Sequence, residues 1–242
     1  MIALQSLNLA GRPLLHAFPE GKSAGALPCV VFYHGFTSSA LVYSYFAVAL
    51  AQAGFRVVMP DAPDHGQRFS GDEQGRLQRF WHILQQSQEE FASLREALLA
   101  QGLVADGRLA VAGASMGGMT ALGIMARHPQ VRCVASLMGS GYFSDLSRTL
   151  FPPSAKEQGM MQSVLAAGEP TRQLARLADR PLLLWHGEED DVVPAAESLR
   201  LQQALRQAGL DANLICRWQA GVRHRITPEA LSCAIDFIRR YL

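Results

Sequence analysis

The stretch "AVAGASMGGMTA" (residues 110–121) decides the fold that this sequence predicts. It places one hydroxyl, Ser115, between Gly113 and Gly117, after an apolar run and before a helical pattern. The bare G-x-S-x-G pattern also arises by chance, so the strand before it and the helix after it carry the inference. A sharp turn between them strains the serine backbone and leaves no room for flanking side chains, which accounts for the glycines. The alternative is a glycine-rich turn with an idle serine.

Short apolar runs alternate with helical patterns along the whole chain, which predicts strand-helix-strand units and a mostly parallel sheet. An opening hairpin is expected around Ala10-Gly11. Counting its two strands, about eight are expected, and the later six lie near 28–34, 55–61, 108–114, 131–139, 181–187 and 212–220. Helices are expected at 40–53, 75–101, 116–128, 194–208 and 227–242. The fold class is therefore α/β.

The helix expected at 75–101 carries apolar residues at three- and four-residue steps, which is the pattern of a core-facing stripe. They are Leu77, Phe80, Trp81, Leu84, Phe91, Leu94 and Leu98.

About forty residues, 141–179, separate two consecutive strands and break this rhythm. A structureless loop of that length is unusual in a compact domain, so we expect a small helical insertion that forms a lid and shapes the substrate pocket. Met160 and Met161 are adaptable apolar side chains that could line an acyl pocket, although ordinary packing explains them equally well.

Composition predicts one globular domain, residues 1–242, because 49% of the residues are hydrophobic and 18% are charged. The net charge of +1 favours neither nucleic acid nor an anionic membrane surface, so we expect a small-molecule partner. The N-terminus does not have the pattern of a signal peptide, and no apolar run is long enough to span a bilayer. We therefore expect a cytoplasmic protein.

The four cysteines are Cys29, Cys133, Cys216 and Cys233, and no two have the spacing of a metal site. We expect buried, reduced thiols. Asp61, Asp64 and His65, in the segment "DAPDHGQRFSG" (61–71), could in principle bind a metal. The same composition makes an ordinary turn, and we favour the turn.

A serine hydroxyl needs a positioned base, and that base needs a third group to hold its tautomer. Asp190 follows one strand in "HGEEDDVVP" (186–194), and His224 follows the last strand in "GVRHRIT" (221–227). The order Ser115, Asp190, His224 is that of a catalytic triad. Asp191 is the alternative acid, and His224 could instead belong to a surface basic patch. His186 is expected to be buried and held by the backbone.

An oxyanion hole is the remaining requirement of such a triad. The early strand ends in "YHGFTSS" (33–39), whose Phe36 amide is one candidate donor. The Met116 amide, directly after the serine at a helix start, is the other. The alternative is a plain strand-to-helix turn.

Together the segments GASMGG, HGFTSS, PDAPDHGQRFSG, HGEEDDVVP and GVRHRITPEA resemble the α/β-hydrolase superfamily over nearly the whole chain. Within it they resemble bacterial YjfP-type esterases, near the dienelactone-hydrolase and prolyl-oligopeptidase-like branches. The resemblance implies ester hydrolysis with Ser115, Asp190 and His224 as triad. Dienelactone hydrolases carry a cysteine where this chain has Ser115, so their substrate is not implied. Prolyl oligopeptidases add a large propeller domain, for which this chain has no residues.

These observations predict a serine esterase for small short-chain acyl esters that needs no cofactor and no metal. A peptidase or acyltransferase with the same triad is the first alternative. A non-catalytic ligand receptor on the same fold is the second.

Overall fold

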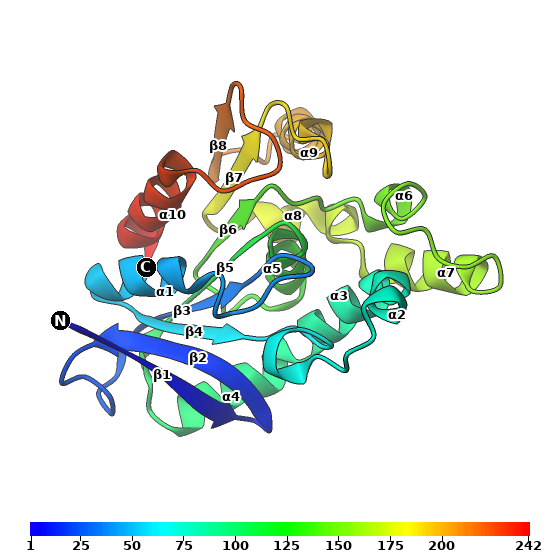
Figure 1. Cartoon of the computed structure of the whole chain (residues 1–242). Helices are drawn as coiled ribbons and strands as arrows, with labels where there is room; N and C mark the ends of the chain where they lie inside the picture. Colours follow the sequence, from blue (N-terminus) through cyan, green and yellow to red (C-terminus); the bar gives the residue numbers. More distant parts are fainter.

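The computed structural model describes residues 1–242, and an eight-stranded sheet forms its centre (Figure 1). The strand order is β1-β2-β4-β3-β5-β6-β7-β8, in which β1 and β2 are antiparallel to their neighbours and the rest are parallel. The expected α/β fold is thereby confirmed. The strands are β1 (Ile2–Leu9), β2 (Arg12–Pro19), β3 (Leu27–Tyr33), β4 (Arg56–Pro60), β5 (Val104–Ala114), β6 (Cys133–Leu137), β7 (Leu182–Gly187) and β8 (Leu214–Gln219).

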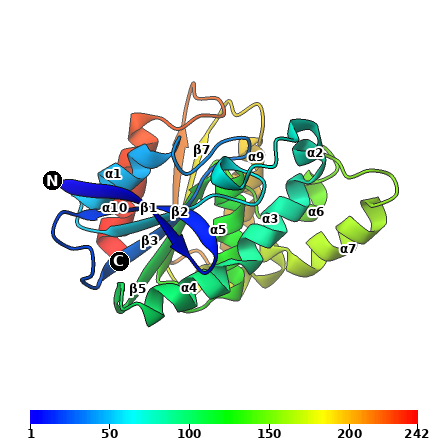
Figure 2. The same cartoon turned by 60° about the horizontal axis from the view of Figure 1, so that its bottom comes forward.

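Helices cover both faces of this sheet, which is why the central strands are apolar on both sides (Figure 2). One face packs on α1 (Ser44–Gln52) and α10 (Pro228–Tyr241). The other packs on α4 (Phe91–Ala100), α5 (Met116–Arg127), α8 (Leu174–Ala178) and α9 (Ala195–Gln207). The remaining helices are η1 (Gly66–Arg68), α2 (Glu73–Gln78), α3 (Phe80–Glu89), α6 (Phe143–Leu146), α7 (Gln158–Gly168) and η2 (Pro170–Gln173).

The prediction of a single helix at 75–101 is wrong, because the structure divides this region into α2, α3 and α4. The two junction residues are held by other segments of the chain. Arg79 forms ion pairs with Asp64 and Asp72, and Glu90 binds Arg68 through two hydrogen bonds of 2.8 Å. The short α2 has no buried residue, and Leu77 is therefore 41% exposed instead of lying in the core stripe.

The segment 141–179 is helical, as expected, but its parts pack in different places. Leu177 of α8 belongs to the core on the sheet face, so α8 is a crossover helix between β6 and β7. In contrast, α6 and α7 pack with Trp81 of α3 and with the start of α5. The Trp81 indole N–H donates to the carbonyl oxygens of Leu150 and Phe151 at 3.1 and 3.2 Å, which anchors the chain between α6 and α7.

All four cysteines are free, as expected, with Cys29 and Cys133 fully buried and Cys216 and Cys233 half-buried. None of the helices has the length and apolar character that crossing a membrane requires.

Two adjacent leucines on α4 test how the sheet is covered. Leu98 is fully buried against the sheet and Leu99 is 39% exposed. Leu98→Ala leaves a cavity and should lower the free energy of unfolding by about 2–5 kcal/mol, whereas Leu99→Ala should change it by less than about 0.5 kcal/mol. Urea unfolding measures both. Equal losses in the two variants would contradict this placement of α4.

Candidate active site

Ser115 lies at the tight turn between β5 and α5, with the backbone angles φ 57° and ψ −119°. A non-glycine residue in this region is strained, and such strain persists only where the surroundings fix it. Here the Ser115 amide donates to the Leu137 carbonyl of β6 at 2.8 Å, and the Ser115 carbonyl accepts from the Met119 amide of α5 at 3.0 Å. The neighbouring strand and the helix therefore hold the serine above the sheet.

The glycines around Ser115 are required by the close approach of other backbone atoms. A Cβ on Gly117 would lie 2.0 Å from the Tyr33 carbonyl oxygen of β3, and one on Gly113 would lie 2.3 Å from the Gly117 carbonyl oxygen. Neither backbone can give way cheaply, because each belongs to the sheet or to the turn itself. The structure thus bears out the packing reason that the sequence pattern suggested.

The three residues predicted as a triad are joined by hydrogen bonds. His224 Nε2 lies 2.8 Å from Ser115 Oγ, and His224 Nδ1 lies 2.7 Å from Asp190 Oδ2. Ser115 follows β5, Asp190 follows β7 and His224 follows β8, so all three lie at the carboxyl edge of the parallel strands.

Backbone hydrogen bonds join the loop after β7, which carries Asp190 (the acid loop), to the loop after β8, which carries His224 (the histidine loop). The Glu188 amide donates to the Gln219 carbonyl at 2.9 Å, and the Glu189 amide donates to the Val222 carbonyl at 3.0 Å. A Cβ on Gly187 would lie 2.4 Å from the Val222 carbonyl oxygen, which explains the glycine before the acidic run. The two loops therefore form one unit that sets the distance between acid and base.

The Asp190 side chain is fully buried and accepts several hydrogen bonds. Its Oδ1 accepts from the Val192 and Val193 amides at 3.0 and 2.9 Å, and its Oδ2 lies 3.2 Å from His186 Nε2. Burial opposes ionisation, but the hydrogen bonds from His186, His224 and the backbone outweigh it and hold the Asp190 pKa far below its ordinary value. The group is therefore a carboxylate at neutral pH.

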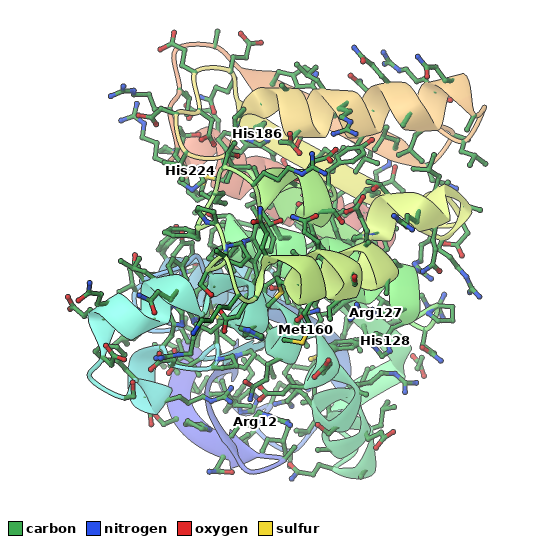
Figure 3. All side chains as sticks on the ribbon, turned by 90° about the vertical axis from the view of Figure 1, so that its right-hand side faces the viewer. Arg12, Arg127, His128, Met160, His186 and His224 are labelled. Atoms are coloured by element: carbon green, nitrogen blue, oxygen red, sulfur yellow. The ribbon has the colours of Figure 1, made fainter.

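His186 is buried at the end of β7 and bound by the backbone, as predicted (Figure 3). Its Nε2 lies 2.8 Å from the Val193 carbonyl oxygen, and its Nδ1 lies 2.8 Å from Ser198 Oγ. Its contact with Asp190 is a second support for the acid that the sequence did not indicate. The alternative acid, Asp191, is half-exposed and pairs with Arg223 at 3.1 Å, away from His224.

The two amides predicted as oxyanion donors lie beside the serine and are free. Neither the Phe36 nor the Met116 amide donates a hydrogen bond within the protein. Met116 N–H begins α5, where the helix dipole favours negative charge. A Cβ on Gly35, before Phe36, would lie 2.9 Å from the Tyr43 hydroxyl, so a larger residue there would displace the Tyr43 side chain.

A hollow of about 350 Å³ opens beside Ser115. Its lining comes from the loop after β3 and the start of α1, from Met138 and from the histidine loop, and comprises Gly35, Phe36, Ser38, Val42, Tyr43, Tyr45, Ser115, Met138, His224, Arg225 and Ile226. None of these residues belongs to 141–179, so the expectation that the insertion shapes this pocket is not met.

The two methionines that were candidates for lining the pocket, with core packing as the equal alternative, do not line it. Met160 is 63% exposed on the outer side of α7 (Figure 3), and Met161 is buried in the cluster with Trp81 and Met119. The helical period explains the difference, because consecutive residues of a helix point about 100° apart. Met161 is a packing residue, which was the alternative reading.

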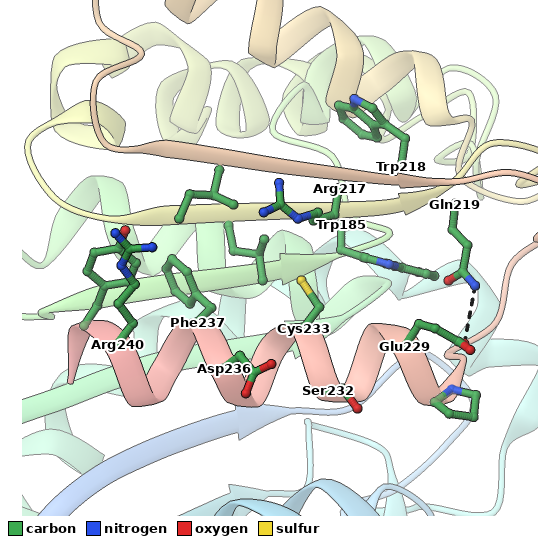
Figure 4. Close-up of a pocket in the computed structure, with 14 residues that line it drawn as sticks. Trp185, Arg217, Trp218, Gln219, Glu229, Ser232, Cys233, Asp236, Phe237 and Arg240 are labelled. Carbon is green, nitrogen blue, oxygen red and sulfur yellow. Dashed lines mark hydrogen bonds between the residues drawn. The ribbon is translucent and has the colours of Figure 1, made fainter.

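A larger hollow, of about 670 Å³, lies elsewhere, between β8 and α10 (Figure 4). Trp185 and Phe237 form part of its floor, and the Gln219 amide donates to Glu229 at 3.4 Å along one end. It contains none of the triad residues. It arises because α10 covers β6 and β7 and leaves the edge strand β8 bare on that face.

Comparison with known proteins identifies the family. Residues 42–240 match the prolyl oligopeptidase family. The chain belongs to this family. Esterase YjfP of Escherichia coli (strain K12) is 62% identical over the full length of both chains. This relative and the family identify the chain as a serine hydrolase.

Two solved structures share the fold of this family member. TT1662 of Thermus thermophilus has a TM-score of 0.80 at 24% identity, covering 99% of this chain and 98% of that one. A puromycin-hydrolyzing peptidase of Mycobacterium tuberculosis has a TM-score of 0.75 at 22% identity, covering 99% of this chain but 39% of that one. The shared fold therefore extends over 99% of the present chain in both comparisons.

Two adjacent aspartates test the assignment of the acid. Asp190→Asn should lower kcat about 10⁴-fold, because the amide would favour the wrong tautomer of His224. Asp191→Asn should change kcat little, since it removes only an exposed ion pair with Arg223. Steady-state kinetics on an activated ester measures both, and a larger loss in Asp191→Asn would move the acid to that residue.

Proposed function

We propose that this protein hydrolyses small carboxylic esters with short acyl chains through a covalent acyl-enzyme at Ser115. The observation that carries the proposal is the continuous hydrogen-bonded chain from Asp190 through His224 to Ser115, beside a hollow of about 350 Å³. A buried carboxylate, a histidine and a serine in this geometry are the parts that acyl transfer needs.

The reaction follows from these positions. Ser115 Oγ attacks the ester carbonyl carbon while its proton passes to His224 Nε2. Asp190 stabilises the imidazolium that forms, and the Phe36 and Met116 amides donate to the oxyanion. His224 then gives the proton to the leaving alcohol. A water molecule repeats the sequence on the acyl-enzyme, which releases the acid and restores Ser115.

The size of the hollow supports short acyl chains. A volume of about 350 Å³ lies near the lower end of the roughly 300–1,000 Å³ of ligand pockets. Tyr45 and Val42 form its outer wall at the start of α1, and Met138 lies deeper. We assign the acyl group to this hollow.

A supporting role is proposed for the part of the expected lid that covers 143–168. Its Phe151 ring packs on Phe36 and Phe80 with ring centroids 5.0 and 4.8 Å apart, and Trp81 holds the same chain by two hydrogen bonds. Since no residue of this segment lines the hollow, we propose that it braces the oxyanion loop, residues 34–39 after β3 with Phe36 among them, and does not determine acyl length.

The proposed nucleophile is tested together with the reaction type. Ser115→Ala should lower kcat for p-nitrophenyl acetate by about 10⁴–10⁶-fold, because the residual rate comes from binding and the oxyanion donors alone. Circular dichroism and urea unfolding provide the control that the variant is folded. A folded Ser115→Ala enzyme with wild-type activity would overturn the assignment.

A peptidase with the same triad is the second candidate, which the family match favours. Comparing kcat/KM for p-nitrophenyl acetate with that for a proline-containing peptide amide separates the two. An esterase turns over the first and not the second.

Substitutions of Tyr45 and Met160 test which residue limits the length of the acyl chain. Both side chains are exposed, but only Tyr45 lines the hollow, so Met160 serves as the control. Tyr45→Ala should raise kcat/KM for hexanoate relative to acetate by about tenfold or more, because each methylene in a pocket contributes about 1–3 kcal/mol. Met160→Ala should leave the profile from acetate to octanoate unchanged. A shift with Met160→Ala and none with Tyr45→Ala would place the acyl group under α7 instead.

A further inference from the structure

The segment 61–71, which resembled a metal site in the sequence, lies against the loop that carries Phe36. The Thr37 amide donates to His65 Nε2 at 3.0 Å, while His65 Nδ1 lies 2.8 Å from the Pro63 carbonyl oxygen. Nδ1 must therefore carry the proton, and Nε2 must be free to accept. His65 is fully buried, so water does not replace either bond.

His34 makes the reciprocal contact from the other side. The Ala62 amide donates to His34 Nε2 at 3.0 Å, and His34 Nδ1 lies 2.7 Å from the Gly35 carbonyl oxygen. That carbonyl belongs to the same planar peptide unit as the Phe36 N–H, and the two groups point in opposite directions in a trans peptide. Fixing the Gly35 oxygen therefore fixes the direction of the Phe36 N–H.

Asp61 adds a third link between the two segments. Its Oδ1 accepts from the Ala40 amide at 2.8 Å, and its Oδ2 accepts from the Gln67 amide at 2.9 Å. Gly66 has a φ of 51°, and a Cβ there would lie 2.2 Å from the Asp61 carboxylate carbon, so this turn requires glycine. The polar groups of the segment are thus used to hold backbone amides.

We propose that His34 and His65 are positioning residues of the reaction, a pair of neutral histidines that orients the Phe36 amide toward the oxyanion. We call the two residues and their four bonds the histidine clasp. It rests on the proposed function, since the Phe36 amide matters only if an oxyanion forms at Ser115. Without it the Gly35–Phe36 peptide would lose the hydrogen bonds that fix its direction.

The backbone of the loop shows why a clasp is needed. Thr37 has a φ of 61°, a left-handed conformation that is unfavourable for a non-glycine residue. The bond from its amide to His65 is the interaction that holds it there. When this acceptor is removed, Thr37 can relax to negative φ, which displaces the Phe36–Thr37 peptide. Through the Phe36 backbone this change also shifts the neighbouring Gly35–Phe36 peptide, whose N–H is the oxyanion donor.

Burial keeps both rings neutral, as the clasp requires. It lowers the pKa of His34 to about 4 and moves the pKa of His65 below its ordinary value. The charged groups that face the pair are Asp61, Asp64 and Arg76, and the two carboxylates oppose the lowering without cancelling it.

The test uses three substitutions of His65 that differ in which bond survives. His65→Gln places an amide near the Nε2 position and can still accept from Thr37, whereas His65→Asn places it near Nδ1 and keeps only the bond to Pro63. His65→Leu removes both. His65→Asn and His65→Leu should lower kcat by about 10²–10³-fold, the loss expected for one oxyanion donor, with KM changed little. His65→Gln should recover at least tenfold of that loss.

The control is His16→Leu, which removes an equally buried histidine on β2 that does not contact the loop. It should lower stability in urea and leave kcat at the wild-type value. If His65→Leu does not fold, the comparison of His65→Asn with His65→Gln still decides. Equal kcat in these two variants, or losses that follow stability in all variants including His16→Leu, would overturn the clasp.

A second readout separates the clasp from the proposed function. The rate at which a p-nitrophenyl phosphonate labels Ser115, followed by mass spectrometry of the intact protein, needs the nucleophile and the oxyanion donors but no ester turnover. Slow labelling of His65→Asn and recovery in His65→Gln support the clasp even if the wild type hydrolyses no ester in the panel. Equal labelling rates would overturn it.

Discussion

The strained turn at Ser115 is the constraint on which the rest of the structure depends. Its φ of 57° exists because β6 and α5 each bind one side of the turn, and because Gly113 and Gly117 let the backbone of β3 approach. Three parallel strands must therefore end at the same level. The loop after β8 reaches the same edge of the sheet and brings His224 within hydrogen-bond distance of the serine oxygen.

Contacts with neighbouring segments also hold the two loops that carry Asp190 and His224. Their mutual backbone hydrogen bonds fix the distance between Asp190 and His224, and His186 adds a contact from below. Asp190 is ionised although it is buried, because hydrogen bonds from two histidines and two amides more than offset the cost of desolvation. The oxyanion loop has its own support in His34, His65 and Phe151. Each functional group thus depends on a second layer of contacts that holds it still.

Several features of the site could be read from the sequence. The glycines bracketing Ser115 and the placement of Asp190 and His224 after successive strands were visible as patterns, and the structure joins these three side chains. Patterns of this kind are local, since a strand end and a tight turn each leave a signature within about ten residues. The long helix at 75–101 was misread for the opposite reason. Its breaks lie at Arg79 and Glu90, whose side chains pair with Asp64 and Arg68, and periodicity does not register such contacts.

The sequence by itself determined the fold class, the order of the strands along the chain and the three residues that meet at the site, because periodicity and glycine spacing act through neighbouring residues. Only the tertiary structure decided which distant segments contact one another and which residues line the hollow at Ser115. In the tertiary structure His65 and Asp61 of 61–71 accept hydrogen bonds from backbone amides of the loop after β3, and Met160 is exposed to solvent. The hollow at Ser115 is lined by Tyr45 and its neighbours and by no residue of 141–179. The physical reason is that such contacts join segments far apart along the chain, and their partners are chosen by packing and not by sequence distance.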